Sequence, residues 1–271
     1  LNMGKGKNNE ELFRSMPVAQ AILTLAVPTV VSQIITIIYN MADTFFIGQL
    51  GDPKQVAAAT LAMPLFMFMT ALSNLFGVGG ASLISRFLGG GEREKASRCG
   101  AFCIWTAAAV SVLYGLMVLA GRPVLLPVLG ANEETCDMAS SYLFGTIGLG
   151  ALPTVMNPAL AHLIRSEGYS RQASLGVAFG GILNMVLDPL FIYGLHLQIT
   201  GAAVATLISN ATAMIYFLAF IWKMRGVSVL TLSPGMYTLG EHIPADVISV
   251  GMPSFLISMM GTVSNTVLNH I

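Results

Sequence analysis

The chain has 271 residues, of which 55% are hydrophobic and only 10% are charged, and its formal net charge at pH 7 is zero. So few charged groups cannot cover the surface of an ordinary soluble domain. The composition therefore predicts an integral membrane protein embedded in a lipid bilayer. We expect no nucleic-acid partner and no cofactor.

Long apolar blocks follow one another along the whole chain. A helix that spans a bilayer needs about 20 apolar residues at ~1.5 Å per residue, and each block meets this length. The blocks predict seven spans in an all-α integral membrane fold, at residues 17–48, 57–86, 99–121, 138–164, 173–195, 201–222 and 245–271.

The polar segments divide this fold into four parts. Residues 1–16 form a charged tail, which is unlike a signal peptide because the apolar block after it is too long. Residues 17–222 form an N-terminal lobe of six helices. Residues 223–244 form a linker that contains helix-breaking Pro and Gly. Residues 245–271 form the first helix of a second, C-terminal lobe.

Basic residues are unequally divided between the two sides of the predicted membrane protein. The N-terminal tail and the loops after the second, fourth and sixth blocks hold eleven Lys and Arg, whereas the alternate loops hold two. Cytoplasmic loops carry an excess of Lys and Arg. We therefore expect a multi-pass protein of the plasma (inner) membrane with a cytoplasmic N-terminus and a cytoplasmic linker.

The seventh block repeats features of the first. Pro28 and Asn40 correspond to Pro253 and Asn265, both at an offset of 225 residues. Because six spans separate the copies, they run in the same direction, as in parallel transporter repeats. Coincidence is the alternative, since Pro and Asn are common in transporter helices. The repeat predicts that the chain is a truncated part of a protein about twice as long, whose C-terminal lobe is otherwise missing.

Two acidic residues, Asp43 and Asp188, lie inside apolar blocks, while the other acidic residues lie in tails and loops. A carboxylate at the centre of a membrane helix costs about 2.5–3.5 kcal/mol on insertion scales, so it is seldom kept without a use. No Lys or Arg lies within the spans to neutralise these two groups. An unpaired buried acid either holds a proton or binds an external cation.

Polar side chains accompany Asp43 along the first block. Ser32, Thr36, Tyr39 and Asn40 are spaced so that, with Asp43, they form one stripe of a helix. Lipid would disfavour such a stripe, so we expect it to face protein or water. Pro28, earlier in the same block, is a candidate bending point.

The fifth and sixth blocks supply further oxygen ligands. Asn184 and Asp188 lie one turn apart on one helix face, and Pro189 deprives the carbonyl of Met185 of its helical partner. The predicted depth of Thr206 in the sixth span nearly matches that of Asp188. Together these oxygens suit a hard cation such as Na⁺. The alternative is that Asn184 and Thr206 only join helices through hydrogen bonds.

The order and spacing of several motifs resemble those of the multidrug and toxic compound extrusion (MATE) family over nearly all of residues 17–271. The motifs are Pro28 with Tyr39-Asn40-Met41-Ala42-Asp43-Thr44, Phe46-Ile47-Gly48-Gln49-Leu50-Gly51, Leu163-Ile164-Arg165-Ser166-Glu167-Gly168, Asn184-Met185-Val186-Leu187-Asp188-Pro189 and Gly201-Ala202-Ala203-Val204-Ala205-Thr206. The resemblance implies twelve helices in two lobes. It also implies export of organic, often cationic, compounds in exchange for Na⁺ or H⁺.

The resemblance also implies roles for single residues. The family's cation site in the N-terminal lobe corresponds to Asp43, Asn184, Asp188 and Thr206, all of which are present. Tyr39 and Asn157 match positions near the same cavity, and with Asn40 they are the candidate substrate-cavity residues; Pro28 and Pro189 are the candidate conformational residues. Most of the second lobe lies outside this sequence, so its binding residues cannot be assigned.

The sequence thus predicts a secondary active transporter, not an enzyme, which exchanges Na⁺ or H⁺ for a small organic substrate such as a cationic drug. Two alternatives remain. A lipid-linked saccharide flippase of the same superfamily would be expected to offer Arg or Lys to a pyrophosphate. An intramembrane aspartyl protease would be expected to carry Tyr-Asp and Gly-x-Gly-Asp, whereas the contexts here are Met-Ala-Asp and Val-Leu-Asp.

Overall fold

The structure is a computed structural model that describes residues 17–269, with the side chains of residues 18, 21, 133, 134 and 261–269 left out. The predicted tail 1–16 and the last two residues of the predicted seventh span lie outside the described part. The side chain of Asn265, one member of the predicted repeat, lies outside it as well.

The described chain is helical along most of its length. The α-helices are α2 (Val18–Gly48), α3 (Pro53–Gly89), α4 (Arg93–Val128), α5 (Glu133–Leu143), α6 (Ala151–Ser166), α7 (Ser170–Pro189), α8 (Gln198–Lys223) and α9 (Ile243–Asn269). Two π-helical segments, η1 (Phe144–Leu149) and η2 (Leu190–Gly194), continue α5 and α7, and a 3₁₀ turn, η3 (Pro234–Met236), lies between α8 and α9.

These helices confirm the predicted all-α membrane fold. Six of them are long and apolar enough to cross a bilayer, and a seventh span results if the bent pair Thr135–Leu149 and Ala151–Ser166 counts as one. That pair, which contains the predicted fourth span, is bent by 46°. The bend lies at Gly150, where a Cβ would come within 2.2 Å of the Thr146 carbonyl oxygen, so only glycine fits there.

The helices extend beyond the apolar blocks, and this corrects the expectation that no basic residue lies within a span. Arg86 is in the last turn of α3 and Arg165 is in the last turn of α6. The Arg165 side chain is half-buried, and its Nη2 donates a hydrogen bond of 3.3 Å to Oγ of Ser32 in α2. The helices continue beyond their apolar residues. Basic residues are tolerated in these last turns because their long side chains can extend from the helix ends to the membrane surface.

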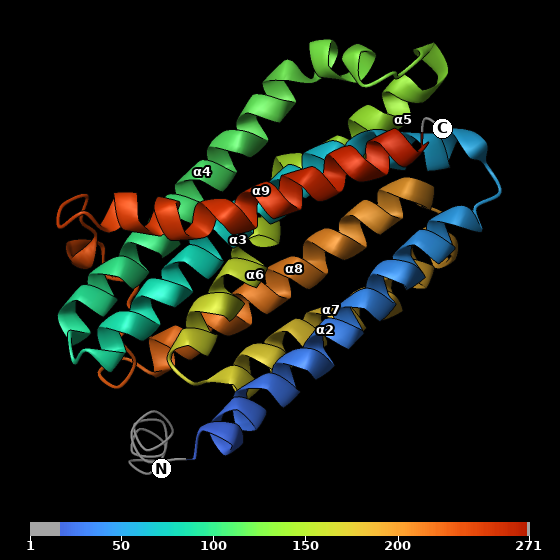
Figure 1. Cartoon of the computed structure of the whole chain (residues 1–271). Coiled ribbons are helices and arrows are strands. Elements are labelled where there is room, and N and C mark those ends of the chain that lie inside the picture. The colour runs from blue at the N-terminus through green and yellow to red at the C-terminus, as the bar shows by residue number, and fades with distance from the viewer. Residues whose placement is uncertain (1–16, 270–271) are drawn as a thin grey trace.

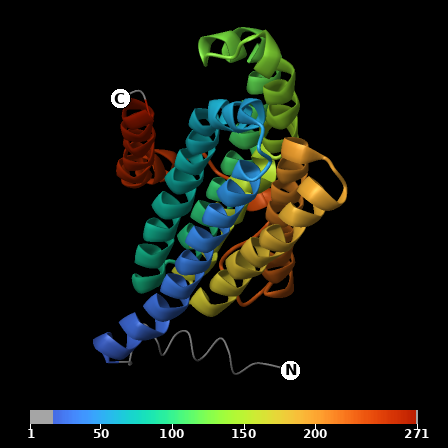
Figure 2. The ribbon, with the colours of Figure 1, turned by 90° about the vertical axis from the view of Figure 1, so that its right-hand side faces the viewer.

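The centre of the fold is α3, which packs against α4, α6 and α9, whereas α2 packs mainly along α7 and α7 along α8. Figures 1 and 2 show α2 and α7 side by side at one edge of the molecule. The largest buried apolar cluster joins α3, α4, α6 and the segment between α8 and α9. In contrast, only 6% of the most apolar part of α2 is buried.

The two ends of the helices differ in charge. One end, here called the linker end, carries the α3–α4 and α6–α7 loops and the segment between α8 and α9; the basic residues on it are Arg86, Arg93, Lys95, Arg98, Arg165, Arg171, Lys223 and Arg225. The opposite end carries Lys54 and Arg122. There, the buried Gln55 accepts from the backbone N–H of Ile199 and donates to Gln198, which joins the starts of α3 and α8.

A buried carboxylate at the linker end binds the segment between α8 and α9. Glu167, in the α6–α7 loop, accepts hydrogen bonds from Ser228 Oγ at 2.7 and 2.9 Å and from Leu230 N at 2.8 Å. Burial raises the pKa of the Glu167 carboxyl, and these hydrogen bonds act in the opposite direction. Arg93 donates to the Val227 carbonyl at 2.7 Å. The segment is therefore fixed to the first lobe.

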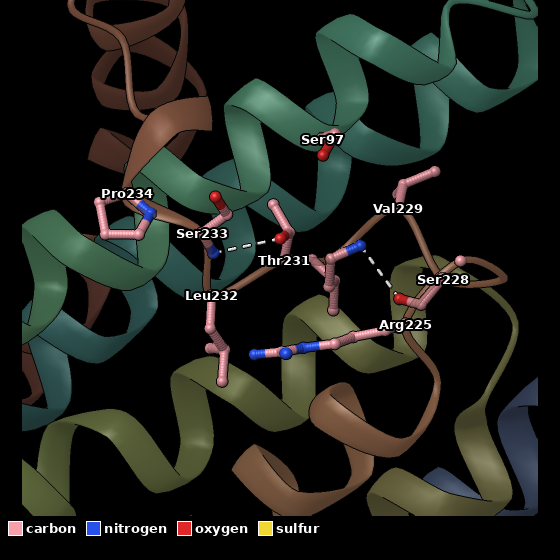
Figure 3. Close-up of a pocket in the computed structure, with 10 residues that line it drawn as sticks. Ser97, Arg225, Ser228, Val229, Thr231, Leu232, Ser233 and Pro234 are labelled. Atoms are coloured by element: carbon pink, nitrogen blue, oxygen red, sulfur yellow. Dashed lines mark hydrogen bonds between the residues drawn. The ribbon is translucent and has the colours of Figure 1, made fainter.

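This bound segment also lines an open cavity of about 550 Å³. Figure 3 shows Ser97 of α4 and the segment side chains around it, with the Ser233 N–H bonded to Thr231 Oγ1 at 3.1 Å. Leu230 packs so closely on α4 that a Cβ at Gly100 would lie 2.8 Å from its side chain. The cavity thus belongs to the contact between the segment and the first lobe.

Helix α9 crosses α3 in close contact (Figure 1). A Cβ at Gly251 would lie 2.1 Å from the Leu75 carbonyl oxygen, and one at Gly79 would lie 2.5 Å from the Val247 carbonyl oxygen. The two glycines therefore let the helix backbones touch. Asn74 Nδ2 adds a hydrogen bond of 2.9 Å to Ser258 Oγ.

We predict that Glu167→Ala releases the segment between α8 and α9. The Ser228 hydroxyl would lose its acceptor and the Leu230 N–H would keep only its bond of 3.0 Å to Ser228 Oγ, and a loss of this kind costs about 1–3 kcal/mol. Trypsin cleavage after Lys223 and Arg225 should therefore become roughly tenfold faster in the folded protein, since each ~1.4 kcal/mol changes the open population tenfold. Glu241→Ala is the control, because it removes only a surface ion pair with Arg98. Equal cleavage rates in the two variants would contradict this role of Glu167.

Candidate functional site

Three of the residues that the sequence singles out meet between α7 and α8. Asn184 Nδ2 donates hydrogen bonds to Asp188 Oδ1 at 3.2 Å and to Thr206 Oγ1 at 3.4 Å. Asp188 is fully buried and Asn184 is 3% exposed. The i, i+4 spacing on α7 brings the Asn184 amide and the Asp188 carboxylate together. The hydrogen bond from Asn184 to Thr206 shows that Thr206 of α8 lies at the same depth as this pair.

Asp43 reaches this region from α2. It interacts electrostatically with Asp188, and both carboxylates interact with the buried Tyr142 of α5. Two contacts fix α2 there. A Cβ at Gly181 of α7 would lie 2.8 Å from the Tyr39 ring, and the last turns of α2 are held by a hydrogen bond of 2.7 Å from Tyr193 Oη to the Phe46 carbonyl. We call Asp43, Asn184, Asp188 and Thr206 the carboxylate site.

A second polar group lies on α6 and α8. Asn157 Nδ2 donates to Asn210 Oδ1 at 2.8 Å, and Asn210 Nδ2 donates to Thr154 Oγ1 at 3.2 Å. We call these three residues the amide bridge. Asn210 follows Thr206 by one helical turn, about 6 Å nearer the linker end. The amide bridge therefore adjoins the carboxylate site along one face of α8.

The buried oxygens of these two groups have an excess of acceptors. Asp43 Oδ1, Asp188 Oδ2, Asn184 Oδ1 and Asn157 Oδ1 are buried and have no hydrogen-bond partner. Each buried acceptor without a donor costs about 1–3 kcal/mol, and such groups in native proteins call for an explanation. A proton or a cation is the kind of group that could satisfy such acceptors.

The other residues of the predicted polar stripe divide between two environments. Ser32 is buried and contacts Arg165, eleven residues before Asp43 and about 16 Å away along α2. Asn40 is exposed, so it does not belong to the buried cluster. Pro28 lies within the continuous helix α2, and Pro189 ends α7 where the π-helical η2 begins.

Sequence reasoning missed Tyr142, Thr154 and Asn210. A tyrosine, a threonine and an asparagine in apolar helices are common, and nothing in their spacing separates them from helix-joining residues. Among the described residues, no group of three or more His, Cys, Asp or Glu could hold a metal ion. The mixture of two carboxylates with amide and hydroxyl oxygens instead suits a hard monovalent cation or a proton.

The chain is similar to known transporters over almost its whole length. The MatE family model matches residues 28–190. The multidrug export protein MepA of Staphylococcus saprophyticus is 31% identical over 257 residues, which cover 95% of this chain and 56% of that protein. The chain thus spans about half the length of the curated relatives it matches.

Solved structures give the same result. A crystal structure of MATE in complex with MaD3S matches with a TM-score of 0.89 and 29% identity over 96% of this chain and 58% of that chain. A structure described as the outward-facing conformation of a multidrug resistance MATE family transporter of the MOP superfamily matches with a TM-score of 0.86 and 28% identity, over 96% of this chain and 57% of that chain.

We predict that Gly181→Val destabilises the fold by separating α2 from α7. The added side chain would clash with the Tyr39 ring, and overpacking of this kind costs about 1–3 kcal/mol. Thermal unfolding in detergent should occur at a temperature several degrees lower than in the unmodified chain. Gly48→Val is the control, because no atom lies within 4 Å of a Cβ at that position. A melting temperature unchanged by Gly181→Val would refute the close packing of the two helices.

Proposed function

The chain belongs to the MatE family, and on this premise we propose that it forms part of a cation-coupled antiporter that exports small organic compounds. The observation that carries the proposal is that Asp43, Asp188, Asn184 and Asn157 each have a buried oxygen without a hydrogen-bond partner, two of these oxygens being on carboxylates. The relatives named as multidrug export protein support the direction and the class of cargo. In this scheme the protein is a secondary active transporter and not an enzyme.

The carboxylate site is where we place the coupling ion. The two negative charges of Asp43 and Asp188 repel each other in an apolar lobe, and one Na⁺ or H⁺ reduces that repulsion. The amide oxygen of Asn184 and the hydroxyl of Thr206 provide neutral oxygens beside Asp188. Na⁺ and H⁺ both suit this set, and no cofactor takes part.

The proposed coupling uses the difference in packing between α2 and α7. Neutralisation of the carboxylates changes the free-energy cost of burying Asp43 beside Asp188. Asp43 is on the loosely packed α2, whereas Asp188 is on α7. We propose that α2 then bends near Pro28, where a backbone hydrogen bond is missing, and that this expels the substrate. The π-helical turn after Pro189 would adjust the position of Asp188 in the same step, since such turns are frequent at functional sites.

A cationic organic substrate fits the same oxygens. An excess of acceptors attracts positive charge, and we propose that Tyr39 and Asn157 contact the cargo, whereas the exposed Asn40 lies apart from these oxygens. We further propose that the protein lies in the plasma membrane with the basic linker end in the cytoplasm, because Lys and Arg are concentrated there. The other lobe of the antiporter would contribute the opposite wall.

The two alternative functions fit the site less well. A flippase for a lipid-linked saccharide would need donors for a pyrophosphate, but the unpartnered oxygens of Asp43, Asp188, Asn184 and Asn157 are acceptors. Arg165 contacts Ser32, about 16 Å from Asp43 along α2, which is too far to serve that purpose at the carboxylate site. For a protease, the two acids would be expected in Tyr-Asp and Gly-x-Gly-Asp, whereas Asp43 and Asp188 lie in Met-Ala-Asp and Val-Leu-Asp.

We predict that Asp188→Asn abolishes efflux without loss of folding. The amide is close in shape to the carboxylate, but it has no charge for a cation or proton to neutralise. Cells that express the variant should accumulate a cationic dye as cells without the protein do, while the melting temperature of the purified variant does not fall. Asp137→Asn is the control, since that carboxylate is exposed on α5. Dye efflux by Asp188→Asn at the unmodified rate would exclude the mechanism.

We also predict that export depends on an ion gradient. In proteoliposomes loaded with the dye, export should require an imposed gradient of Na⁺ or of protons, because the carboxylate site must be neutralised from one side and emptied to the other. Removing the gradient that drives export should reduce the rate to that of Asp188→Asn. Export that continues with both gradients dissipated would show that the protein is a passive pathway.

A further inference from the structure

The amide bridge has a fixed direction of hydrogen bonding. Asn157 gives an amide hydrogen to Asn210, and Asn210 gives one to Thr154. Each of these bonds uses the oxygen of one partner and the NH₂ group or hydroxyl of the next. The oxygen of Asn210 is thereby occupied, whereas the oxygen of Asn157 is buried without a partner.

This arrangement determines which end of the Asn157 amide faces Asn210. The nitrogen and oxygen of a side-chain amide are bonded to the same carbon and point in different directions. Because the Asn157 nitrogen donates to Asn210, the Asn157 oxygen points away from Asn210. If Asn210 could not accept, the Asn157 amide could rotate and satisfy its oxygen elsewhere. Asn210 therefore maintains the buried acceptor that Asn157 presents.

The bridge is also tied to the carboxylate site. Asn210 and Thr206 occupy the same face of α8, one turn apart, and Thr206 accepts from Asn184. Asn184 of α7 and Asn157 of α6 thus each donate to this face of α8, and each keeps its own oxygen without a partner. Both are neutral acceptors in an otherwise apolar lobe.

We propose that Asn210 is a positioning residue of the cation site, which holds the Asn157 carbonyl oxygen as an additional neutral ligand for Na⁺. The inference rests on the proposed function, because it needs the carboxylate site to bind a cation. Neutral amide oxygens coordinate Na⁺, whereas they do not bind a proton near neutral pH. The amide bridge thus extends the site with ligands that are useful only for a metal cation.

Positioning residues of this kind have measurable effects. Partners that orient the ligands of a metal commonly change its affinity by about 10–100-fold when they are replaced. We therefore expect Asn210→Leu to weaken Na⁺ binding about tenfold in the purified full chain in detergent, measured by equilibrium dialysis with radioactive sodium. The number of ions bound at saturation should stay the same.

A double-mutant comparison separates positioning from general damage. If Asn210 acts through Asn157, then Asn157→Leu, Asn210→Leu and the double variant should all weaken Na⁺ binding by the same factor, since the second change removes nothing further. Multiplied effects in the double variant would overturn the proposal. Asn74→Leu is the matched control, because Asn74 is a half-buried asparagine that binds Ser258 on α9.

Two further measurements test the proposal: the pH dependence of Na⁺ binding, and Na⁺ binding by Asp188→Asn. Acid should inhibit Na⁺ binding with the same midpoint in Asn210→Leu and in the unmodified chain, because the carboxylates still compete for protons; a shifted midpoint would mean that Asn210 acts on the carboxylates, against the proposal. Asp188→Asn should lose Na⁺ binding altogether.

The outcomes also distinguish this inference from the proposed function. If Asp188→Asn binds Na⁺ normally, the carboxylate site itself is wrong. If Asp188→Asn loses binding but Asn210→Leu keeps unmodified affinity, only the role of Asn210 is wrong. If the unmodified chain binds no Na⁺ while export responds to a proton gradient, the proposed antiporter stands and the sodium ligand set is overturned.

Discussion

The structure depends on one electrostatic constraint, which is the burial of acceptor oxygens among apolar helices at places where no hydrogen-bond donor reaches them. Two carboxylates and two amides leave Asp43 Oδ1, Asp188 Oδ2, Asn184 Oδ1 and Asn157 Oδ1 without partners. A lobe optimised only for stability would replace such groups by apolar residues of the same shape, because that substitution is often neutral or stabilising. Under the proposed function, a Na⁺ or H⁺ would occupy these oxygens for part of the transport cycle.

Close backbone contacts and irregular helices make this arrangement possible. Gly181 admits the Tyr39 ring, so α2 can approach α7, and the Gly150 bend redirects α6 after η1. The π-helical η2 follows directly on Asp188 and Pro189. These departures from regular packing surround the carboxylate site, where local geometry is expected to serve function before stability.

The sequence alone was sufficient to predict the spans, the two acidic residues inside apolar helices and the Asn184–Asp188 pair. Each of these follows from hydropathy or from residue spacing within a single helix. It was not sufficient for the amide bridge, whose partners Asn157 and Asn210 are 53 residues apart. That contact depends on how α6 and α8 are rotated about their axes, and hydropathy leaves this rotation undetermined when both faces are buried. The bend at Gly150 and the binding of Ser228 by Glu167 were missed for the same reason, since both depend on contacts between segments.

The uneven packing of the helices indicates which part of the lobe can move. Helix α3 is held by α4, α6 and α9, and Glu167 binds the segment between α8 and α9 to the same body. Helix α2 has one main neighbour, α7, and most of its apolar surface is exposed. A change of charge at Asp43 would therefore act on a helix with one main neighbour, whereas Asp188 lies on α7, which packs against both α2 and α8. Because α2 carries Asp43 and the other helices carry Asn184, Asp188 and Thr206, a rearrangement of α2 would change the distances within the carboxylate site, and under the proposed function this would couple ion binding to helix movement.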